Sequence, residues 1–245
     1  VIDMLQVVDR GGLFLPSCGL WMDARRPKRF AVVSHAHSDH TAPHQSFIAT
    51  APTIDFMRIR LGDAAARRGI VLPYREPYQH GPLKIELFPA GHILGSAMVH
   101  VTTESGESLL YTGDFKTRFG LAAEKIQVPQ VDTLVMESTF GRPDFTFPPS
   151  LAVHEAIRSY CQQSFADGEI PILLAYSLGK AQEVLKILED VQLPIMAHRA
   201  IRALNPVYQK YGFCLPATRP LDCDNMEGHI AVSYTHLRAH ETLLY

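Results

Sequence analysis

The sequence predicts an α/β protein in two parts, and three observations carry this prediction. Short apolar runs dominate residues 1–147, a proline-rich segment interrupts them at 142–150, and strand and helix patterns alternate after it. The 245 residues and 47% hydrophobic content suffice for one large domain, or for one domain and part of another. We therefore expect one domain at residues 1–147 and the beginning of a second at 148–231.

The first part is rich in predicted strands. Apolar runs bounded by polar residues, glycine or proline predict strands, and a longer segment with helical spacing predicts one helix at residues 53–68. The predicted strands lie at residues 13–15, 30–33, 85–88, 98–102, 109–112 and 134–136.

The second part has the alternating order of strands and helices that is typical of a small parallel sheet. Ser150 stands where an N-cap is expected, before a helix that runs toward Ala166. A strand at 170–175, a helix at 179–189, a strand at 194–197 and a helix at 200–211 are expected to follow.

The most informative chemical motif runs from Ser34 to His40, directly after the second apolar run. Three imidazoles and one carboxylate form a ligand set that suits zinc, and zinc sites with an open position activate water for hydrolysis. In an extended segment His35 and His37 lie on one side, while Asp39 and His40 follow where the chain turns. We expect two metal ions in one pocket.

Two further ligand candidates, His92 and Asp114, stand at or just past the ends of apolar strands and can point into the same rim. With the HxHxDH pattern at residues 35–40, they resemble the metallo-β-lactamase superfamily. Asp23 resembles the acid of the first motif of that family, which orients the metal loop.

The resemblance implies an αββα sandwich and a pair of zinc ions, with Mn²⁺ as the alternative metal. A histidine at position 37, where redox-active di-iron relatives place a carboxylate, favours zinc and hydrolysis. The implied assignment gives the first ion His35, His37 and His92, the second ion Asp39 and His40, and makes Asp114 the bridge.

A later motif, from Glu137 to Gly141, resembles the one that opens the β-CASP branch of the superfamily, which acts on nucleic acids. Residues 148–231 would then begin the inserted, parallel α/β β-CASP domain. The resemblance implies that Glu137 pairs with a later histidine, which helps to protonate the leaving oxygen.

Runs spread over residues 10–210 resemble the bacterial ligase-associated DNA exonucleases. The most discriminating run, residues 175–182, follows a strand and opens a helix, where backbone N–H groups, Ser177 and Lys180 could meet phosphate. A plain strand-to-helix turn with Gly179 for close packing is the alternative interpretation.

This closer resemblance implies a zinc-dependent exodeoxyribonuclease that acts in DNA repair, with DNA as substrate and an ATP-dependent DNA ligase and a helicase as partners. Three alternatives stay open: an RNase or mRNA 3′-end-processing nuclease of the same branch, a non-catalytic nucleic-acid-binding subunit, and a small-molecule hydrolase. The 2′-hydroxyl contacts that would identify an RNA substrate cannot be found in the sequence.

Composition favours a cytoplasmic enzyme, because the sequence shows neither a membrane-spanning stretch nor a signal peptide. The four cysteines are far apart, so neither a zinc knuckle nor a disulfide framework is expected. A net charge of −2 speaks mildly against a nucleic-acid binder. Basic residues cluster at 25–29 and at 58–68, and each cluster is more typical of a solvated face than of a binding surface.

The C-terminal segment at residues 232–245 resembles the translation of a transposase sequencing adapter. We expect this tail to pack poorly, and we expect His236, His240 and Glu241 to form no metal site. The histidine partner of Glu137 and the last ligand of the second zinc lie further downstream in the resembled family. The chain as given is therefore expected to be inactive.

Overall fold

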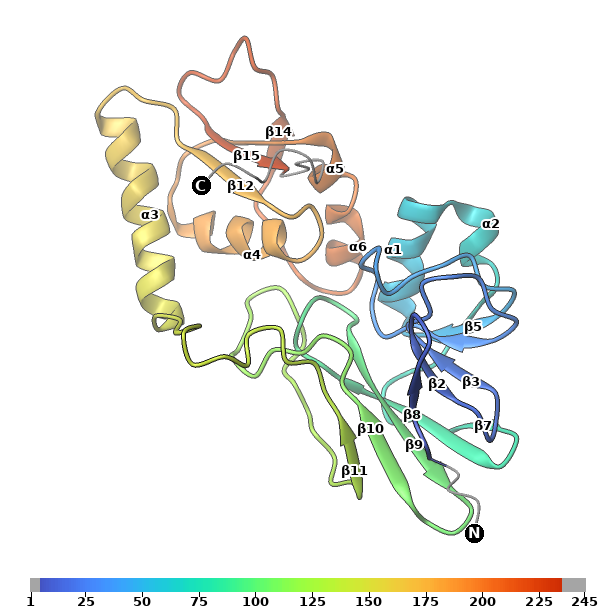
Figure 1. The fold of residues 1–245 in the computed structure, drawn as a ribbon. Coiled ribbons are helices and arrows are strands. Elements are labelled where there is room, and N and C mark those ends of the chain that lie inside the picture. Colours follow the sequence, from blue (N-terminus) through green and yellow to red (C-terminus); the bar gives the residue numbers. More distant parts are fainter. Residues whose placement is uncertain (1–4, 235–245) are drawn as a thin grey trace. The chain divides into compact units, whose positions relative to one another are not determined.

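The computed structural model describes residues 5–234, which form a mixed α/β structure with three β-sheets (Figure 1). The chain divides into two compact units, Val1–Phe145 and Thr146–Tyr245. The division lies two residues before the boundary expected at residue 147. Within residues 5–234, no helix is both long enough and apolar enough to cross a membrane.

The first unit contains two sheets. One sheet is antiparallel from β1 to β3 and parallel from β3 to β6. Its strands are β1 (Val8–Asp9), β2 (Leu13–Leu15), β3 (Leu20–Met22), β4 (Ala31–Val32), β5 (Phe47–Ala49) and β6 (Gly69–Val71).

The second sheet has the order β11-β10-β9-β8-β7, and it is antiparallel except for the parallel pair β10 and β11. Because β8 and β10 both run antiparallel to β9, they run parallel to each other and end at the same edge of the sheet. The strands are β7 (Tyr78–His80), β8 (Leu83–Pro89), β9 (Ala97–Thr103), β10 (Ser108–Tyr111) and β11 (Thr133–Val135).

The two sheets of the first unit share one hydrophobic core. Every second residue of β8 is buried, as expected for a strand with one face on the core. Burial of each large side chain contributes about 1.5 to 3 kcal/mol, so this core is the main source of stability for the loops at the sheet edges. Its members include Leu15, Leu20, Met22, Val32, Ile48, Leu83, Ile85, Leu87, Val99, Val101 and Leu109.

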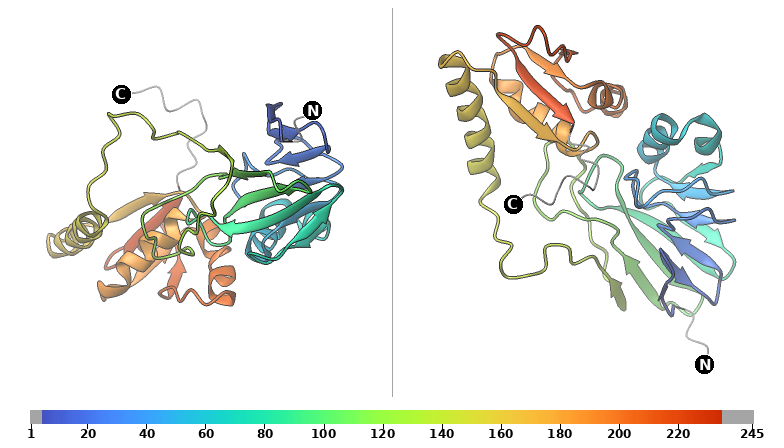
Figure 2. Two further views of the ribbon diagram at one scale, coloured as in Figure 1. Left: turned by 90° about the horizontal axis from the view of Figure 1, so that it is seen from below. Right: turned by 45° about the horizontal axis from the view of Figure 1, so that its top comes forward.

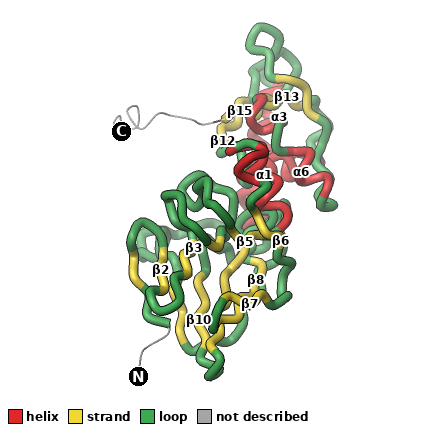
Figure 3. Tube along the Cα trace, turned by 90° about the vertical axis from the view of Figure 1, so that its right-hand side faces the viewer, coloured by secondary structure: helices red, strands yellow, loops and turns green. Residues whose placement is uncertain are grey.

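The helix predicted at residues 53–68 is in fact two helices, α1 (Ala51–Leu61) and α2 (Asp63–Ala66). The prediction was wrong at Gly62, which has a φ of 90° and cannot continue an α-helix in that conformation. Helix α1 packs beside β6 in the first unit (Figure 3). The side chain of Ile54 lies over Gly69 of this strand.

The second unit is built on the predicted parallel sheet, whose order is β12-β15-β13-β14 (Figure 2). The predicted N-cap Ser150 is instead the first residue of α3, and Pro149 takes the N-cap position without a side-chain hydrogen bond. The elements are α3 (Ser150–Ala166), β12 (Ile172–Ala175), α4 (Lys180–Ile187), a 3₁₀ turn (Leu188–Asp190), β13 (Ile195–Ala197), α5 (Arg199–Arg202), α6 (Asn205–Lys210), β14 (Thr218–Pro220) and β15 (Ile230–Tyr234).

The expectation that the chain packs poorly from Val232 onward is wrong for its first three residues. Strand β15 pairs with both β12 and β13, and Val232 is fully buried. The sequence Val232 to Tyr234 contains residue types with high strand propensity, so it extends the strand that Ile230 begins, whatever its origin. His236, His240 and Glu241 lie outside the described residues.

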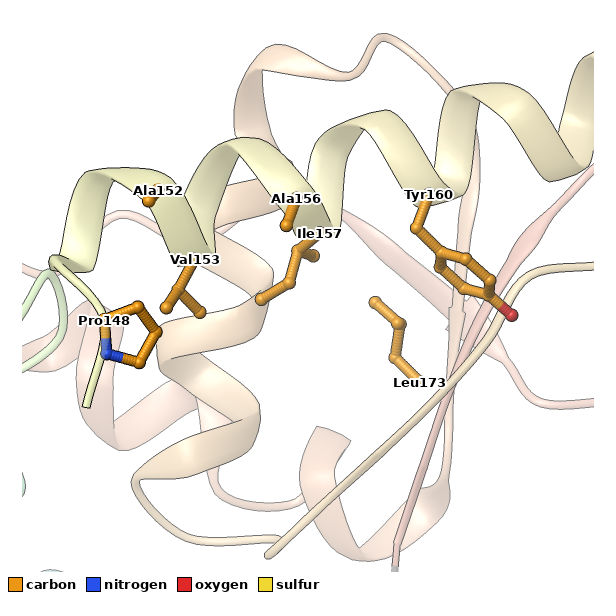
Figure 4. Close-up of a pocket in the computed structure, with 7 residues that line it drawn as sticks. All are labelled: Pro148, Ala152, Val153, Ala156, Ile157, Tyr160 and Leu173. Carbon is orange, nitrogen blue, oxygen red and sulfur yellow. The ribbon is translucent and has the colours of Figure 1, made fainter. Parts of the chain in front are cut away.

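Helix α3 and strand β12 border a shallow apolar hollow in the second unit (Figure 4). Nearby apolar side chains are unusually exposed, with Leu174 at 65% and Leu151 at 80% of full exposure. The hollow is lined by Pro148, Ala152, Val153, Ala156, Ile157, Tyr160 and Leu173.

Candidate metal centre

The candidate ligands come from loops that follow strands of the first unit. The loop after β4 carries His35 and His37, the loop after β8 carries His92, and the loop after β10 carries Asp114. Since β8 and β10 end at the same edge of their sheet, the last two ligands are brought together by the topology. Glu137 follows β11, which is parallel to β10 and ends at that edge too.

The first group of ligand atoms has the spacing that a tetrahedral metal needs. His35 Nε2 lies 3.0 Å from His37 Nδ1, which lies 3.2 Å from His92 Nε2. Asp114 Oδ2 lies 3.7 Å from His35 Nε2 and 3.5 Å from His92 Nε2. A tetrahedral zinc ion with bonds of about 2.0 to 2.1 Å separates its ligand atoms by roughly 3.3 Å. The four side chains therefore fit such an ion.

A second group of ligand atoms lies around His40. His40 Nε2 is 3.3 Å from Asp114 Oδ1 and 3.6 Å from Asp39 Oδ2. Asp114 thus presents one oxygen to the first group and the other to His40, which is the arrangement of a bridging carboxylate. The Asp39 side chain is 66% exposed, so it can adjust toward a cation without disturbing the core.

Asp23 is placed to orient the ligands. It is buried, and its Oδ1 accepts from the Ser34 N–H at 2.7 Å. Its Oδ2 accepts from Ser34 Oγ at 2.6 Å, from His40 Nδ1 at 2.8 Å and from the Tyr111 hydroxyl at 2.9 Å. Asp23 also lies within reach of a metal position with His35 and His40, but these four donors already use its acceptor capacity.

This network fixes which imidazole nitrogens face the metal positions. Ser34 Oγ donates its proton to Asp23, so the contact of 2.9 Å between Ser34 Oγ and His35 Nδ1 requires His35 to donate. His40 donates from Nδ1 to Asp23 in the same way. Both histidines therefore turn Nε2 toward the site, as metal-ligating histidines with a hydrogen-bonded second nitrogen do.

The electrostatics of the site call for a cation. Burial and the neighbouring histidines lower the pKa of His35 well below its usual value, so this imidazole is neutral and can bind metal. Burial works against protonation of His40, but hydrogen bonds and charge from Asp114 and Asp23 outweigh it and raise its pKa to about 10. The two carboxylates thus keep a proton on His40, and a divalent ion could take the place of that proton.

The loop that carries His92 is held by residues that sequence reasoning missed. The Gly95 N–H donates to Glu124 Oε2 at 2.9 Å, and the Gly95 carbonyl accepts from Thr50 Oγ1 at 2.6 Å and from Thr53 Oγ1 at 3.1 Å. A Cβ on Gly95 would lie 2.7 Å from a carbon of Pro52, so no other residue fits here. The Thr-x-Pro-Thr start of α1 was the available signal, because threonine before a helix often caps it.

Other contacts steady the same region. The Tyr74 hydroxyl donates to the Ser96 carbonyl at 3.0 Å, and Ser96 Oγ accepts from the His92 N–H at 3.1 Å. Arg60 of α1 donates to the Ala36 carbonyl at 2.8 Å, between two of the ligand histidines. Arg60 belongs to the basic cluster at 58–68, so part of that cluster supports the metal loop.

Glu137 lies beside the Asp114 loop. Its Oε1 accepts from the Phe115 N–H at 3.2 Å, and its own N–H donates to Thr112 Oγ1 at 3.3 Å. Among residues 5–234, the Glu137 carboxylate makes no hydrogen bond or ion pair with a histidine. Its general-acid role stays a prediction.

Ser177 and Lys180 belong to the second unit. The turn before α4 is closed by Gln182, which accepts from the Gly179 N–H at 2.8 Å and donates to the Ser177 carbonyl at 3.1 Å. The Ala181 N–H is also used, because it donates to the Tyr176 carbonyl. Two N–H groups that phosphate could have used are therefore occupied, and phosphate binding at Ser177 and Lys180 stays a prediction.

No family model matches the chain, but several curated proteins do. It is 43% identical over 222 residues to a protein named probable DNA ligase from Opitutus terrae, a match that covers 90% of this chain and 22% of that protein. It is 30% identical to the transcription termination factor FttA of Methanothermobacter thermautotrophicus, over 65% of this chain and 30% of FttA. It is 26% identical to an RNase J-like protein of Methanocaldococcus jannaschii, over 84% of this chain and 58% of that protein.

These relatives show that the chain belongs to the metallo-β-lactamase family, in its β-CASP branch. The chain spans less than a third of the length of the first two relatives. Its fold is similar to a crystal structure of a protein of unknown function from Enterococcus faecalis V583, with a TM-score of 0.57 at 15% identity, over 86% of this chain and 59% of that one.

Proposed function

We propose that this chain carries the metal centre of a phosphodiester hydrolase that removes nucleotides from DNA ends. The observation that supports this most is the convergence of His35, His37, His92 and Asp114 on one point, with the second oxygen of Asp114 turned toward His40. A binding scaffold has no need for such a set of ligands. We further propose that the pocket holds two zinc ions and that the parent protein acts in DNA repair.

The residues of the chain would divide the work as follows. When bound, two divalent ions polarise a phosphodiester and lower the pKa of water, so that hydrolysis runs at neutral pH. Asp23 keeps His40 in the tautomer that binds metal, and Ser34 does the same for His35. Glu137, next to the Asp114 loop, is the candidate for assisting proton transfer to the leaving oxygen.

DNA is the first choice of substrate because the relative named probable DNA ligase matches at 43% identity over 90% of the chain. RNA is the second choice, supported by the RNase J-like relative at 26% identity. We infer from the ligase relative that an ATP-dependent DNA ligase is a partner, with a helicase as a further one, and that the protein works in the cytoplasm.

The test combines metal content with hydrolysis. The chain and His92→Ala, Asp114→Asn and His154→Ala variants would be loaded with Zn²⁺ or Mn²⁺, and bound metal would be counted by mass spectrometry. Hydrolysis of end-labelled single-stranded DNA, double-stranded DNA and RNA would be measured with this chain and with any longer protein that the same gene encodes. His154 lies on α3, far from the ligands in sequence, and serves as the matched histidine control.

We expect the His92 and Asp114 variants to lose bound metal and the control to keep it. Release of single nucleotides from DNA ends by the longer protein, abolished by both variants, would support the exonuclease. Full metal content in the His92 variant would show that the assigned centre is wrong. Cleavage of RNA but not of DNA would show that RNA is the substrate, and it would not contradict the assigned metal centre.

A further inference from the structure

A stack of aromatic and basic side chains covers the outer face of β2 and β3. Phe14 and Trp21 are direct cross-strand neighbours, and their rings stack with centroids 4.4 Å apart. Lys28 Nζ lies 3.5 Å from the centroid of the Trp21 ring, and Arg10 Cζ lies 5.6 Å from that of Phe14. Leu15 and Leu20 are fully buried, so the alternation of the strands turns both rings away from the core. We call Arg10, Phe14, Trp21 and Lys28 the cation–aromatic stack.

The positive charge around the stack is not neutralised. Arg25, Arg26 and Arg29 are exposed in the loop that contains Lys28, and the Arg25 N–H donates to the Gly11 carbonyl beside Arg10. Within the described part of the chain, these three arginines and the two stack cations make no ion pair with a carboxylate. The nearby Asp9 uses its carboxylate to accept from the Gly11 and Gly12 N–H groups.

Basic residues elsewhere in the molecule are engaged differently. Arg58 pairs with Asp55 and Asp63, and Arg67 also pairs with Asp63. Arg68 donates to the His44 carbonyl. The basic cluster at 58–68 is therefore largely committed to contacts within the protein, whereas the cluster at 25–29 leaves its charge to solvent. A net charge of −2 for the whole chain hides this concentration of positive charge.

We propose that the cation–aromatic stack binds a single-stranded polynucleotide, with bases on the Phe14 and Trp21 rings and phosphates on Lys28 and the neighbouring arginines. Ring faces at a surface accept any base by stacking, and basic side chains beside them follow the backbone. The cations that cover the rings are long and flexible, so each can turn to a phosphate when a base takes its place.

The position of the stack suits a substrate path to the metal centre. Trp21 is two residues before Asp23, which orients His40 and accepts from the Tyr111 hydroxyl. The stack and the ligands belong to the same unit. A strand held on the stack would therefore be fixed relative to the ions. This inference rests on the proposed function for the identity of the polymer, but binding can be measured without hydrolysis.

Trp21 is the only tryptophan of the chain, so its fluorescence reports on this surface alone. The zinc-loaded protein would be titrated with a short oligo(dT) whose phosphorothioate linkages resist cleavage, and in parallel with oligo(rU) and with inorganic polyphosphate. We expect saturable quenching by the oligonucleotides, since a stacked base quenches the indole. Polyphosphate, which has charge but no bases, should bind without comparable quenching.

Variants separate stacking from charge. Phe14→Leu keeps every charge and the tryptophan, and we expect it to weaken oligo(dT) binding about 5- to 100-fold. Lys28→Gln should weaken oligo(dT) binding. Its affinity should also rise less steeply than that of the wild type as the salt concentration falls. Lys210→Gln is the matched control, because Lys210 also lies over an aromatic ring but belongs to the second unit. Its Nζ is 5.2 Å from the centroid of the Tyr211 ring. Circular dichroism checks that the Phe14 variant folds, and the exposed Arg26→Gln offers a second test that leaves the stacked rings unchanged.

The outcomes distinguish this inference from the proposed function. Absence of saturable quenching, or equal losses in the Lys28 and Lys210 variants, would overturn the stack as a binding surface. Polyphosphate that binds as tightly as oligo(dT) and quenches as strongly would point to an unspecific anion site and would also overturn it. Quenching and variant effects as expected, in a protein that hydrolyses no nucleic acid, would leave the stack standing and remove the proposed activity.

Discussion

Replacement of Asp23 by asparagine tests how far the metal centre depends on its orienting acid. The backbone at this position has a φ of 50°, which asparagine tolerates, so the change acts on the side chain. Asp23 receives four donors, one on Oδ1 and three on Oδ2. An amide has one accepting oxygen and one NH₂ group, which only donates. In the variant the NH₂ group would therefore face either the Ser34 N–H or the three groups that donate to Oδ2, and those groups would lose their acceptor.

The magnitude follows from this mismatch. Loss of a hydrogen bond to a charged group costs about 1.5 to 3 kcal/mol, and removal of a group that orients a metal ligand typically weakens metal binding about 10- to 100-fold. A second effect opposes the first. Asp23 helps to raise the pKa of His40 to about 10, so the proton that competes with the metal is held more weakly in Asp23→Asn.

The two effects have different pH dependence. At a pH below the raised pKa, His40 of the wild type must release a proton before it can bind metal. In the variant the pKa of His40 is lower, so releasing this proton costs less free energy. The relief fades as the pH rises toward 10, while the loss of orientation persists. We therefore expect the ratio of the zinc dissociation constants, variant over wild type, to increase between about pH 7 and pH 9.

Zinc affinity would be measured by competition with a chelator of known affinity. Asp132→Asn is the matched control, since Asp132 accepts from the Ser108 N–H and hydroxyl in the same unit without touching a ligand. Equal zinc affinity in Asp23→Asn and wild type at every pH would refute the orienting role. So would a loss of the same size in the Asp132 variant.

Three further changes probe the surroundings of the centre. Gly113→Ala should lower both the melting temperature and its increase on adding zinc, because the new Cβ would lie 2.6 Å from Ser34 Oγ; an unchanged melt would contradict this. His44 is buried, and burial lowers its pKa to about 4, so its contribution to stability is lost as pH falls from about 6.5 to 4, at most about 3 kcal/mol. His44→Asn keeps an acceptor for the Lys28 N–H. In this variant the free energy of unfolding, measured with urea, should depend less on pH between about 4 and 6.5; the same pH dependence as in the wild type would argue against the role of His44. Asp39→Ala should remove one bound zinc and, in the longer protein, hydrolysis of DNA ends, with little change in melting; normal turnover would exclude the two-metal assignment.

The cluster of candidate metal ligands could be predicted from the sequence, because each of its residues follows an apolar run and has a side chain that binds metal. The residues that hold them could not. Tyr111 donates to Asp23 across 88 positions of sequence, and Glu124 reaches Gly95 across 29. A tyrosine or glutamate at such a distance gives no local pattern, and only the pairing of strands brings it to the ligand loop.

Elements with an apolar run or a clear start signal could be predicted, including the three-residue strand β2, whereas strands without such a run could not. A bounded apolar run indicated β8, and the proline-rich segment before Ser150 indicated the start of α3; these elements have 7 and 17 residues. Strands such as β1 and β7, with two and three residues, are too short to show a period, and they exist because a neighbouring strand supplies hydrogen bonds. The β15 strand was missed for another reason. The resemblance of residues 232–245 to a translated adapter led us to expect poor packing, but Val232 to Tyr234 have strand propensity and pair with β12 and β13.

The place of β15 in its sheet constrains how the protein can fold during synthesis. This strand is the last of the sheet to leave the ribosome, yet it lies between β12 and β13, which do not pair with each other. Until it arrives, two apolar strands have open edges and no partner to join them, which is the kind of intermediate that aggregates or recruits chaperones. The first unit needs no such late arrival, because all its strands precede residue 136. The His and Asp cluster of the first unit could therefore come together on the nascent chain well before the second sheet closes.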